Sequence, residues 1–254
     1  MARKVQGYGW RPDLPDGRDL RYGAPPEALE VLPDLVDLRE QCPPVYDQGQ
    51  LGSCTANAIG GALEFDQIKQ SQPTPFTPSR LFIYYNERDI EGSVDSDNGA
   101  EIRDGVKSVA KQGACKEDTW PYEIDRFRDK PADAAYTEAS EHQAIRYLRV
   151  TQTLNQLKGC LAEGFPFVFG FVVYEGFESK EVADSGHLEI PKAGEQQLGG
   201  HAVLAVGYEE AHQWFIVRNS WGDGWGMDGY FTMPYPYLLQ STLASDLWTI
   251  RSVE

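Results

Sequence analysis

Cys54, His201, Asn219 and Gln48 have the side-chain types needed for attack by a thiol on a carbonyl carbon. Cys54 begins a segment whose small and apolar residues, at spacings of three and four, predict a buried helix over residues 54–68. A thiol in the first turn of a helix lies near unsatisfied N–H groups, and such positions lower the pKa of a cysteine from about 8.5 to roughly 3.5–7.5. We therefore expect a reactive thiolate at Cys54. The alternative for a single cysteine at a helix start is a small packing residue.

His201 and Asn219 lie on either side of a predicted hairpin. Residues 201–206 and 214–218 are apolar strands, and the polar residues 209–211 between them predict a turn. If the turn centres near Glu210, antiparallel pairing places His201 opposite Asn219, with Cβ atoms roughly 4.5–5.5 Å apart. The Asn219 amide oxygen would then accept a hydrogen bond from one ring nitrogen of His201 and leave the other nitrogen for a nucleophile.

Gln48 precedes Cys54 by six residues, with Gly49 and Gly52 between them. The two glycines allow the chain to fold back, so that the Gln48 amide and the Cys54 backbone N–H point to one place. Two donors that converge beside a nucleophile form an oxyanion hole.

Several segments resemble the papain and cathepsin family. Residues 48–54, Gln-Gly-Gln-Leu-Gly-Ser-Cys, resemble its active-site signature, and residues 219–226, Asn-Ser-Trp-Gly-Asp-Gly-Trp-Gly, resemble its asparagine motif. Residues 200–208 are similar to its histidine strand, and residues 32–39 are similar to the start of a mature enzyme. The matches follow the family's order across residues 32–254, so the chain looks like a divergent, bacterial-looking member with a short N-terminal extension.

The resemblance implies a papain-like cysteine endopeptidase that hydrolyses peptide bonds through a thioester acyl-enzyme. In that reading Cys54 is the nucleophile, His201 the base and acid, Asn219 the residue that orients His201, and Gln48 an oxyanion donor. Gly99, Ala100, Gly200 and Trp221 are then the expected substrate-binding residues, with Trp221 shielding the hydrogen bond between His201 and Asn219 from water. No metal and no cofactor is expected.

Two departures from the family pattern bear on the compartment. Leu51 replaces the family cysteine that joins a disulfide, and Thr55 replaces the usual tryptophan. Without that disulfide the fold does not need an oxidising compartment, and the first residues do not lead into the apolar region of a secretory signal. A cytoplasmic location is therefore favoured, and we expect Cys42, Cys115 and Cys160 to be packing thiols.

The fold class that these patterns predict is α+β. Further helices are expected over residues 79–89, 101–111 and 153–163, and a further strand over residues 167–173. By resemblance, a helical lobe covers about residues 32–140 and a β-barrel-like lobe about residues 141–254, with the active-site cleft between them.

Residues 1–31 read as an extended arm because prolines and glycines interrupt them too often for a helix to propagate. Tyr8, Trp10, Leu14, Leu20 and Tyr22 supply apolar anchors along the arm. We expect the arm to pack on the surface and to cross the cleft as a short regulatory or inhibitory pro-segment, as in a zymogen. A disordered tail is the alternative.

The formal net charge of −16 disfavours nucleic acids and anionic membranes as partners, because both are polyanions. The expected partners are peptide or protein substrates and the chain's own arm, and we expect a monomer.

Two other functions use the same residues: an acyltransferase or transpeptidase that passes the acyl group to an amine, and a peptide-binding module that has lost catalysis. A binding module is expected to have lost the nucleophile, the base or the oxyanion donor, and this sequence retains a candidate for each.

Overall fold

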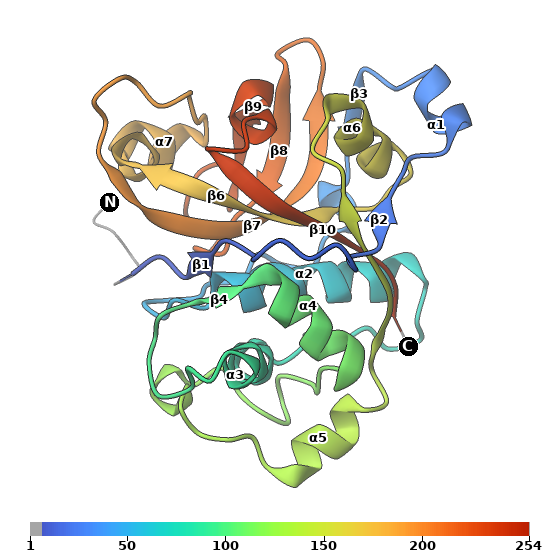
Figure 1. Ribbon diagram of the computed structural model, residues 1–254, viewed down its shortest axis with the longest axis vertical. Helices are drawn as coiled ribbons and strands as arrows, with labels where there is room; N and C mark the ends of the chain where they lie inside the picture. Colours follow the sequence, from blue (N-terminus) through green and yellow to red (C-terminus); the bar gives the residue numbers. More distant parts are fainter. Residues whose placement is uncertain (1–6, 254) are drawn as a thin grey trace.

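The computed structural model describes residues 7–253 and shows an α+β protein with a helical lobe and a sheet lobe (Figure 1). The helical lobe lies below the sheet in this view and contains α2 (Cys54–Lys69), α3 (Arg80–Ile90), α4 (Ile102–Lys111) and α5 (Asp133–Ala139). Smaller elements are α1 (Pro26–Glu30), α6 (Leu154–Ala162), α7 (Lys180–Ser185), α8 (Tyr235–Leu239) and the 3-10 turns Arg39–Gln41, Ile124–Arg126 and Glu175–Glu178.

The second lobe is an eight-stranded sheet of mostly antiparallel strands. Its order is β2-β5-β10-β6-β7-β8-β9, with β3 paired to β7 beside this path. The strands are β2 (Arg21–Tyr22), β3 (Leu35–Asp37), β5 (Ala144–Val150), β6 (Phe167–Tyr174), β7 (Gln197–Glu209), β8 (Trp214–Arg218), β9 (Tyr230–Pro234) and β10 (Ala244–Val253). Within residues 7–253 this sheet stays open, so it is no closed barrel.

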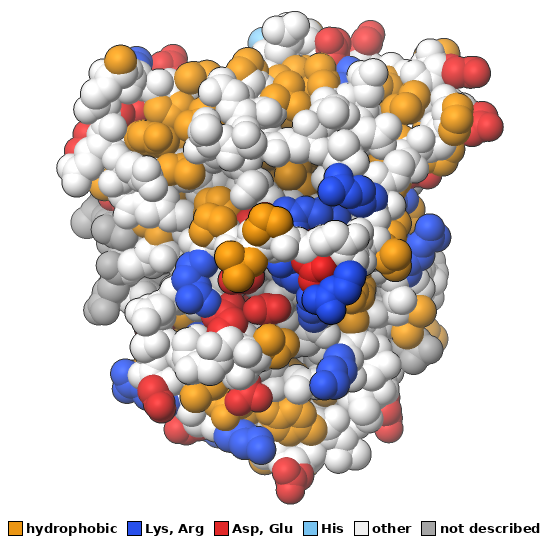
Figure 2. Space-filling view, in the orientation of Figure 1, with side chains coloured by type: hydrophobic (Ala, Val, Ile, Leu, Met, Phe, Trp, Pro, Cys, Tyr) orange, Lys and Arg blue, Asp and Glu red, His pale blue; other side chains and the backbone are white. Residues whose placement is uncertain are grey.

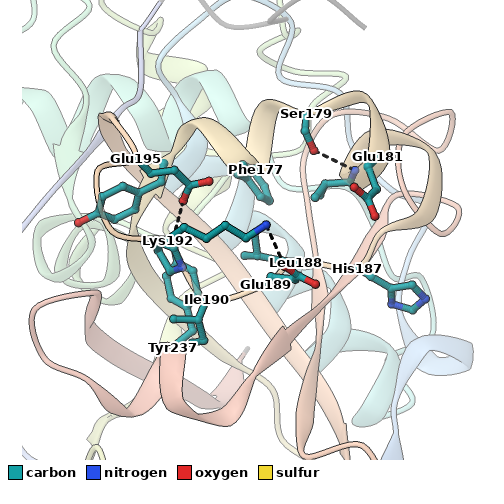
Figure 3. A pocket seen from close by; sticks show the side chains of 14 residues that line it. Phe177, Ser179, Glu181, His187, Leu188, Glu189, Ile190, Lys192, Glu195 and Tyr237 are labelled. Carbon is teal, nitrogen blue, oxygen red and sulfur yellow. Dashed lines mark hydrogen bonds and ion pairs between the residues drawn. The ribbon is translucent and has the colours of Figure 1, made fainter.

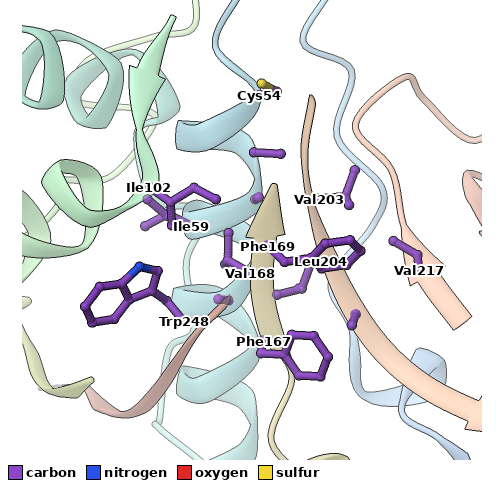
Figure 4. Packing of buried hydrophobic residues seen from close by; sticks show 14 of the residues in the cluster. Cys54, Ile59, Ile102, Phe167, Val168, Phe169, Val203, Leu204, Val217 and Trp248 are labelled. Carbon is purple, nitrogen blue, oxygen red and sulfur yellow. The ribbon is translucent and has the colours of Figure 1, made fainter. Parts of the chain in front are cut away.

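Helix α2 lies between the two lobes and is buried on all sides. Its residues from Cys54 to Gln67 are all buried, and most of them are small or apolar. The polar ones include Thr55 and Asn57, which hydrogen-bond to Glu87 and Ser53. Figure 4 shows this helix with Cys54 at its upper end and Ile59 facing α4, while Phe167 and Phe169 of β6 lie on the other side. The nucleophile candidate is thus fixed to the most buried helix of the chain.

The sequence-predicted elements agree with the structure, with shifts of one or two residues for most of them. The helices predicted over residues 54–68, 79–89, 101–111 and 153–163 are α2, α3, α4 and α6, and α3 begins after Ser79, whose hydroxyl accepts the N–H of Phe82 at 3.1 Å. The predicted strand 214–218 is β8, whereas β7 extends well beyond the predicted residues 201–206.

The predicted hairpin register is wrong by about two residues. Leu204 pairs with Arg218 and Glu209 pairs with Trp214, with a bulge between Ala205 and Gly207. The turn is longer than predicted and the bulge adds a residue to β7, so His201 lies beyond the end of the ladder with β8 rather than directly opposite Asn219.

The N-terminal arm follows the boundary between the lobes, as the dark blue trace in Figure 1 shows. Its strand β1 (Trp10–Arg11) pairs in parallel with β4 (Ala100–Glu101) of the helical lobe. Further along, β2 pairs in parallel with β5 of the sheet. The described part of the arm, residues 7–31, therefore packs along the protein, and the disordered-tail alternative does not hold for these residues.

The four cysteines are all free thiols, as expected. Cys115 and Cys160 are buried, and Cys42 is half-buried. None of the helices in the described part of the chain is long and apolar enough to cross a membrane.

Candidate active site

Cys54 lies at the first position of α2 with its side chain fully buried. The backbone N–H groups of Ala202, Gly9 and Thr55 lie near the thiol and favour its ionised form. Ala202 follows His201 on β7, so the thiol at the helix start meets the strand that carries the histidine. Gly9 belongs to the N-terminal arm, which therefore reaches the thiol itself.

His201 and Asn219 make the hydrogen bond that the sequence predicted. The Nε2 atom of His201 lies 2.8 Å from the amide oxygen of Asn219, and both side chains are buried. The same oxygen also accepts the backbone N–H of Ser220 at 2.9 Å, which fixes the amide orientation. The indole of Trp221 stacks on the imidazole, with ring centroids 5.2 Å apart. Because Asn219 directly follows β8, the bond forms despite the shifted register.

Gln48 is held in place by Ser220. The Ser220 hydroxyl donates to the Gln48 side-chain oxygen at 2.6 Å, and the Gln48 backbone N–H donates to the Ser220 carbonyl at 2.9 Å. The Gln48 side-chain NH2 donates one hydrogen bond to the carbonyl of Leu51 at 2.9 Å. An amide NH2 has two hydrogens, so this geometry leaves the second one for another acceptor near the start of α2.

The arm covers this site with residues 8–13, which we call the strap. The Tyr8 hydroxyl donates to Glu178 at 2.6 Å, and its ring meets the imidazole of His201 edge-on at a centroid distance of 5.8 Å. At Gly9, a Cβ atom would come within 1.7 Å of the Gly52 carbonyl oxygen, so only glycine fits there. The Gly9 carbonyl accepts the N–H of Ala100 at 2.8 Å.

Trp10 of the strap fills a pocket made by two glycines of the sheet. A Cβ atom at Gly170 would come within 1.9 Å of the indole, and one at Gly200 within 2.5 Å. The side chain of Trp10 is 6% exposed. Gly99, with φ +72°, likewise lies against the Gly9 backbone. Three of the four expected substrate-binding residues, Gly99, Ala100 and Gly200, thus contact the strap, and the fourth, Trp221, lies 6.4 Å from Tyr8 between ring centroids.

Burial shifts the pKa of both Cys54 and His201, the candidate reactive groups, away from the charged forms. It raises the pKa of the Cys54 thiol to about 12, and the hydrogen bonds from Ala202 and Gly9 only partly offset it. Burial also lowers the pKa of His201 to about 4, against the opposing hydrogen bond to Asn219. The expectation of a lowered thiol pKa therefore fails for the closed arrangement, because desolvation outweighs the helix N-terminus.

Two supporting carboxylates were missed by the sequence analysis. Asp97 accepts the N–H of Gly52 at 3.0 Å and the hydroxyl of Tyr84, and so holds the turn before Cys54. Glu87 is fully buried and accepts the hydroxyl of Thr55 at 2.5 Å. The only sequence signal was Thr55 itself, a polar residue where the family has tryptophan.

A cavity of about 280 Å³ lies beside the site on the sheet lobe (Figure 3). Its apolar lining includes Phe177, Leu188 and Tyr237, and glutamates stand at its rim. Phe177 connects the cavity to the site, since its ring packs on Trp221 with centroids 5.1 Å apart. Within residues 7–253 no cluster of three or more potential metal ligands occurs.

The family model for the papain family of cysteine proteases matches residues 32–244. The chain belongs to the papain family. A papain-family relative from Acanthamoeba polyphaga mimivirus, described as an uncharacterized peptidase C1-like protein, is 43% identical over 98% of this chain and 88% of its own length. Pro-cathepsin H of Bos taurus is 30% identical over 74% of this chain, which spans 55% of that longer protein.

Solved papain-family structures agree with the fold. Xylellain, a cysteine protease from Xylella fastidiosa, matches with a TM-score of 0.92 and 44% identity, covering 100% of this chain and 99% of its own. Procathepsin L 3 of Tenebrio molitor matches with a TM-score of 0.72 at 19% identity, over 96% of this chain and 75% of that one. The expected papain-like fold and cysteine-protease family are confirmed, and the match over the full length of xylellain includes the arm.

Proposed function

We propose that this papain-family protease is a thiol endopeptidase with Cys54 as nucleophile, His201 as base and acid, Asn219 as orienting residue and Gln48 as oxyanion donor. The observation that carries the proposal is the 2.8 Å bond between His201 and Asn219 beside the buried thiol at the start of α2. With Nε2 engaged by Asn219, the other ring nitrogen is the one left to exchange a proton with Cys54.

In the proposed reaction the Cys54 sulfur attacks the peptide carbonyl carbon, and the negative charge that develops on the oxygen is held by the Gln48 amide and the Cys54 N–H. His201 then gives its proton to the departing amine as the C–N bond breaks, leaving a thioester. Water, deprotonated by His201, attacks the thioester and releases the acid and the free thiol.

The strap suggests where each half of a substrate binds. His201 has to reach the departing nitrogen, so the leaving half belongs on the side of His201 and Trp221, where Tyr8 now lies. The acyl half belongs along Ala100, where Trp10 now lies. The extended strap passes the thiol and continues on both sides, which favours internal cleavage of long peptides.

The same geometry explains why the active site would not cleave the strap that covers it. The strap runs from the leaving-group side to the acyl side, opposite to the direction inferred for a substrate. It turns the N–H of Gly9 toward the thiol, while the Gly9 carbonyl is engaged by Ala100. The thiol therefore faces no carbonyl carbon at this residue, and the strap acts as an inhibitor instead of a substrate.

The test is hydrolysis of a fluorogenic peptide amide with an aromatic residue at P2 and arginine at P1, under reducing conditions. The full chain, a chain that begins at Leu14 and the same shortened chain with Cys54→Ala are compared. We expect turnover in the shortened chain, much slower turnover in the full chain, and none with Cys54→Ala. Activity that survives Cys54→Ala would refute the proposal. A folded shortened chain that cleaves none of a broad set of peptides would refute it as well.

A further inference from the structure

The N-terminal arm is attached to the protein in two different ways. Its second part, residues 19–31, is built into the sheet lobe: β2 pairs with β5, and the N–H of Arg149 donates to the Leu20 carbonyl at 2.8 Å. The side chain of Tyr22 is only 4% exposed, and the N–H of Ala24 donates to Gln156 at 2.6 Å. This part is a fixed component of the lobe.

The first part, the strap, is joined to the fixed part by an exposed turn. Leu14 is 71% exposed, and the side chain of Arg18 is 88% exposed. Asp16 pairs with Arg18 inside the turn itself, at 2.7 Å. Most of residues 14–18 are thus exposed, as a hinge requires, although the Leu14 carbonyl accepts a hydrogen bond from Arg103. The turn lies between the buried carboxylates of Asp13 and Asp19.

The strap ends in a buried group of charges between the two lobes. The carboxylate of Asp13 has no exposed surface and accepts the indole N–H of Trp248 at 2.9 Å. It also accepts a hydrogen bond from Arg149 at 3.2 Å and the backbone N–H of Arg103 at 3.0 Å. One side chain of the strap therefore ties α4 of the helical lobe to β5 and β10 of the sheet lobe. Figure 2 shows basic and acidic side chains side by side along this boundary.

The body of the protein keeps its own partners for both arginines. Arg103 pairs with Asp19 at 2.7 Å, and Arg149 pairs with Asp246 at 2.7 Å. Withdrawal of Asp13 therefore leaves neither guanidinium as an unpaired buried charge, which would otherwise be costly. The group holds three carboxylates, of Asp13, Asp19 and Asp246, and two guanidiniums, of Arg103 and Arg149. When all are ionised the group has one negative charge in excess, and withdrawal of Asp13 removes it.

We propose that the strap is a reversible gate: Asp13 latches it into this group of charges, residues 14–18 are the hinge, and residues 19–31 stay docked when the gate opens. The gate acts on the thiol of the proposed active site, so the inference rests on the proposed function. No residue has to be removed for the site to open, in contrast to a cleaved pro-segment.

The test measures exposure of Cys54 directly, without a peptide substrate. Iodoacetamide alkylation is followed by mass spectrometry of the Cys54 peptide for the full chain, Asp13→Ala, Asp16→Ala and the chain that begins at Leu14. Asp16 is a matched control because it is an aspartate of the same arm whose ion pair lies inside the turn. We expect Asp13→Ala to react at least tenfold faster than the parent, approaching the shortened chain, and Asp16→Ala to react like the parent. Equal rates for Asp13→Ala and the parent would overturn the latch.

Hydrogen exchange separates gate opening from loss of the fold. The N–H of Ala100 is bound to Gly9 of the strap, and the N–H of Arg149 is bound to Leu20 of the fixed part. In Asp13→Ala we expect the Ala100 amide to exchange faster and the Arg149 amide to keep its protection. Equal loss of protection at both amides would overturn the hinge. If alkylation and exchange behave as expected but the shortened chain cleaves no peptide, the gate stands and only the proposed function is refuted.

Discussion

The indole ring of Trp10 lies on Gly170 so closely that a methyl group at residue 170 would come within 1.9 Å of the ring. Among the described residues, the indole N–H of Trp10 has no hydrogen-bond partner in this pocket. The pocket therefore accommodates the shape of a large flat ring without a polar contact to it, and it lies on the side proposed for the acyl half of a substrate.

In the chain that begins at Leu14, we expect Gly170→Ala to reduce kcat/KM for a peptide with phenylalanine at P2 by about tenfold or more. Overfilling a packed pocket costs about 1–3 kcal/mol, and about 1.4 kcal/mol is tenfold. A peptide with alanine at P2 should change little. Gly23→Ala is the control, since nothing lies within 4 Å of a Cβ atom there. Equal losses for both peptides would show that the ring does not bind in this pocket.

Replacing Trp10 with alanine in the full chain should release the strap. Truncating a buried tryptophan costs about 3–5 kcal/mol, and here the cost falls on the closed state alone. We expect Cys54 to be alkylated about a hundredfold faster or more. Leu14→Ala, at an exposed position of the same arm, should leave the alkylation rate unchanged. A Trp10→Ala chain as slow as the parent would mean that other contacts hold the strap shut.

Ser220→Ala should lower kcat more than it changes KM, because Ser220 acts through Gln48. Its loss removes the 2.6 Å hydrogen bond that orients the amide and leaves a buried oxygen unsatisfied, at a cost of about 1–3 kcal/mol. We expect kcat of the shortened chain to fall roughly tenfold or more. Ser140→Ala, on the surface, is the control. An increase in KM with kcat intact would assign Ser220 to substrate binding.

The pH dependence of gate opening should follow Asp13. Burial, and next the neighbouring Asp246, raises the pKa of Asp13 to about 6 in the closed state, from an ordinary value of 3.8. The closed state therefore binds a proton more tightly, and its stability is greatest below about pH 4 and is lost as the pH rises through 6. Above about pH 4 the closed pair carries one proton, as a thiol with neutral imidazole. An open pair of thiolate and imidazolium would carry one proton as well, so the pair adds little to the slope.

The measurement is the rate at which Cys54 reacts with a pyridyl disulfide, in the full chain and in the chain that begins at Leu14. We expect the rate of the full chain divided by that of the shortened chain to rise about a hundredfold from pH 4 to 7. Asp13→Asn should make this ratio independent of pH, while Asp16→Asn should keep the parent's slope. A slope that persists in Asp13→Asn would place the titrating group elsewhere.

The two truncations should differ in stability. A chain that begins at Leu14 retains β2 and the buried ring of Tyr22, whereas a chain that begins at Leu32 loses both. Loss of a buried aromatic side chain costs about 3–5 kcal/mol, so we expect the melting temperature of the Leu32 chain to fall by several degrees or more. The Leu14 chain should melt close to the parent. Equal melting temperatures would show that residues 14–31 do not contribute to the folded lobe.

The amino-acid sequence by itself determined the helix at Cys54, the strands of the hairpin and the resemblance to the papain family. These features depend on local patterns: small and apolar residues at helical spacing, short apolar runs typical of strands, and short motifs around Cys54, His201 and Asn219. It also indicated that the arm has something to pack against. This is right for Tyr8, Trp10 and Tyr22 and wrong for Leu14 and Leu20, which are each 71% exposed.

Only the tertiary structure decided the hairpin register, the state of the thiol and the path of the arm. At the bulge between Ala205 and Gly207, the Val206 carbonyl accepts the N–H of Leu38, which directly follows β3, at 2.9 Å. Burial raises the pKa of Cys54, and the segments that surround the thiol include Gly9, 45 residues before it, and Ala202, 148 residues after it. The charge group joins Asp13 to Asp246 and Trp248 near the opposite end of the chain. Desolvation and buried ion pairing arise between segments far apart in sequence, so no local pattern could have predicted them.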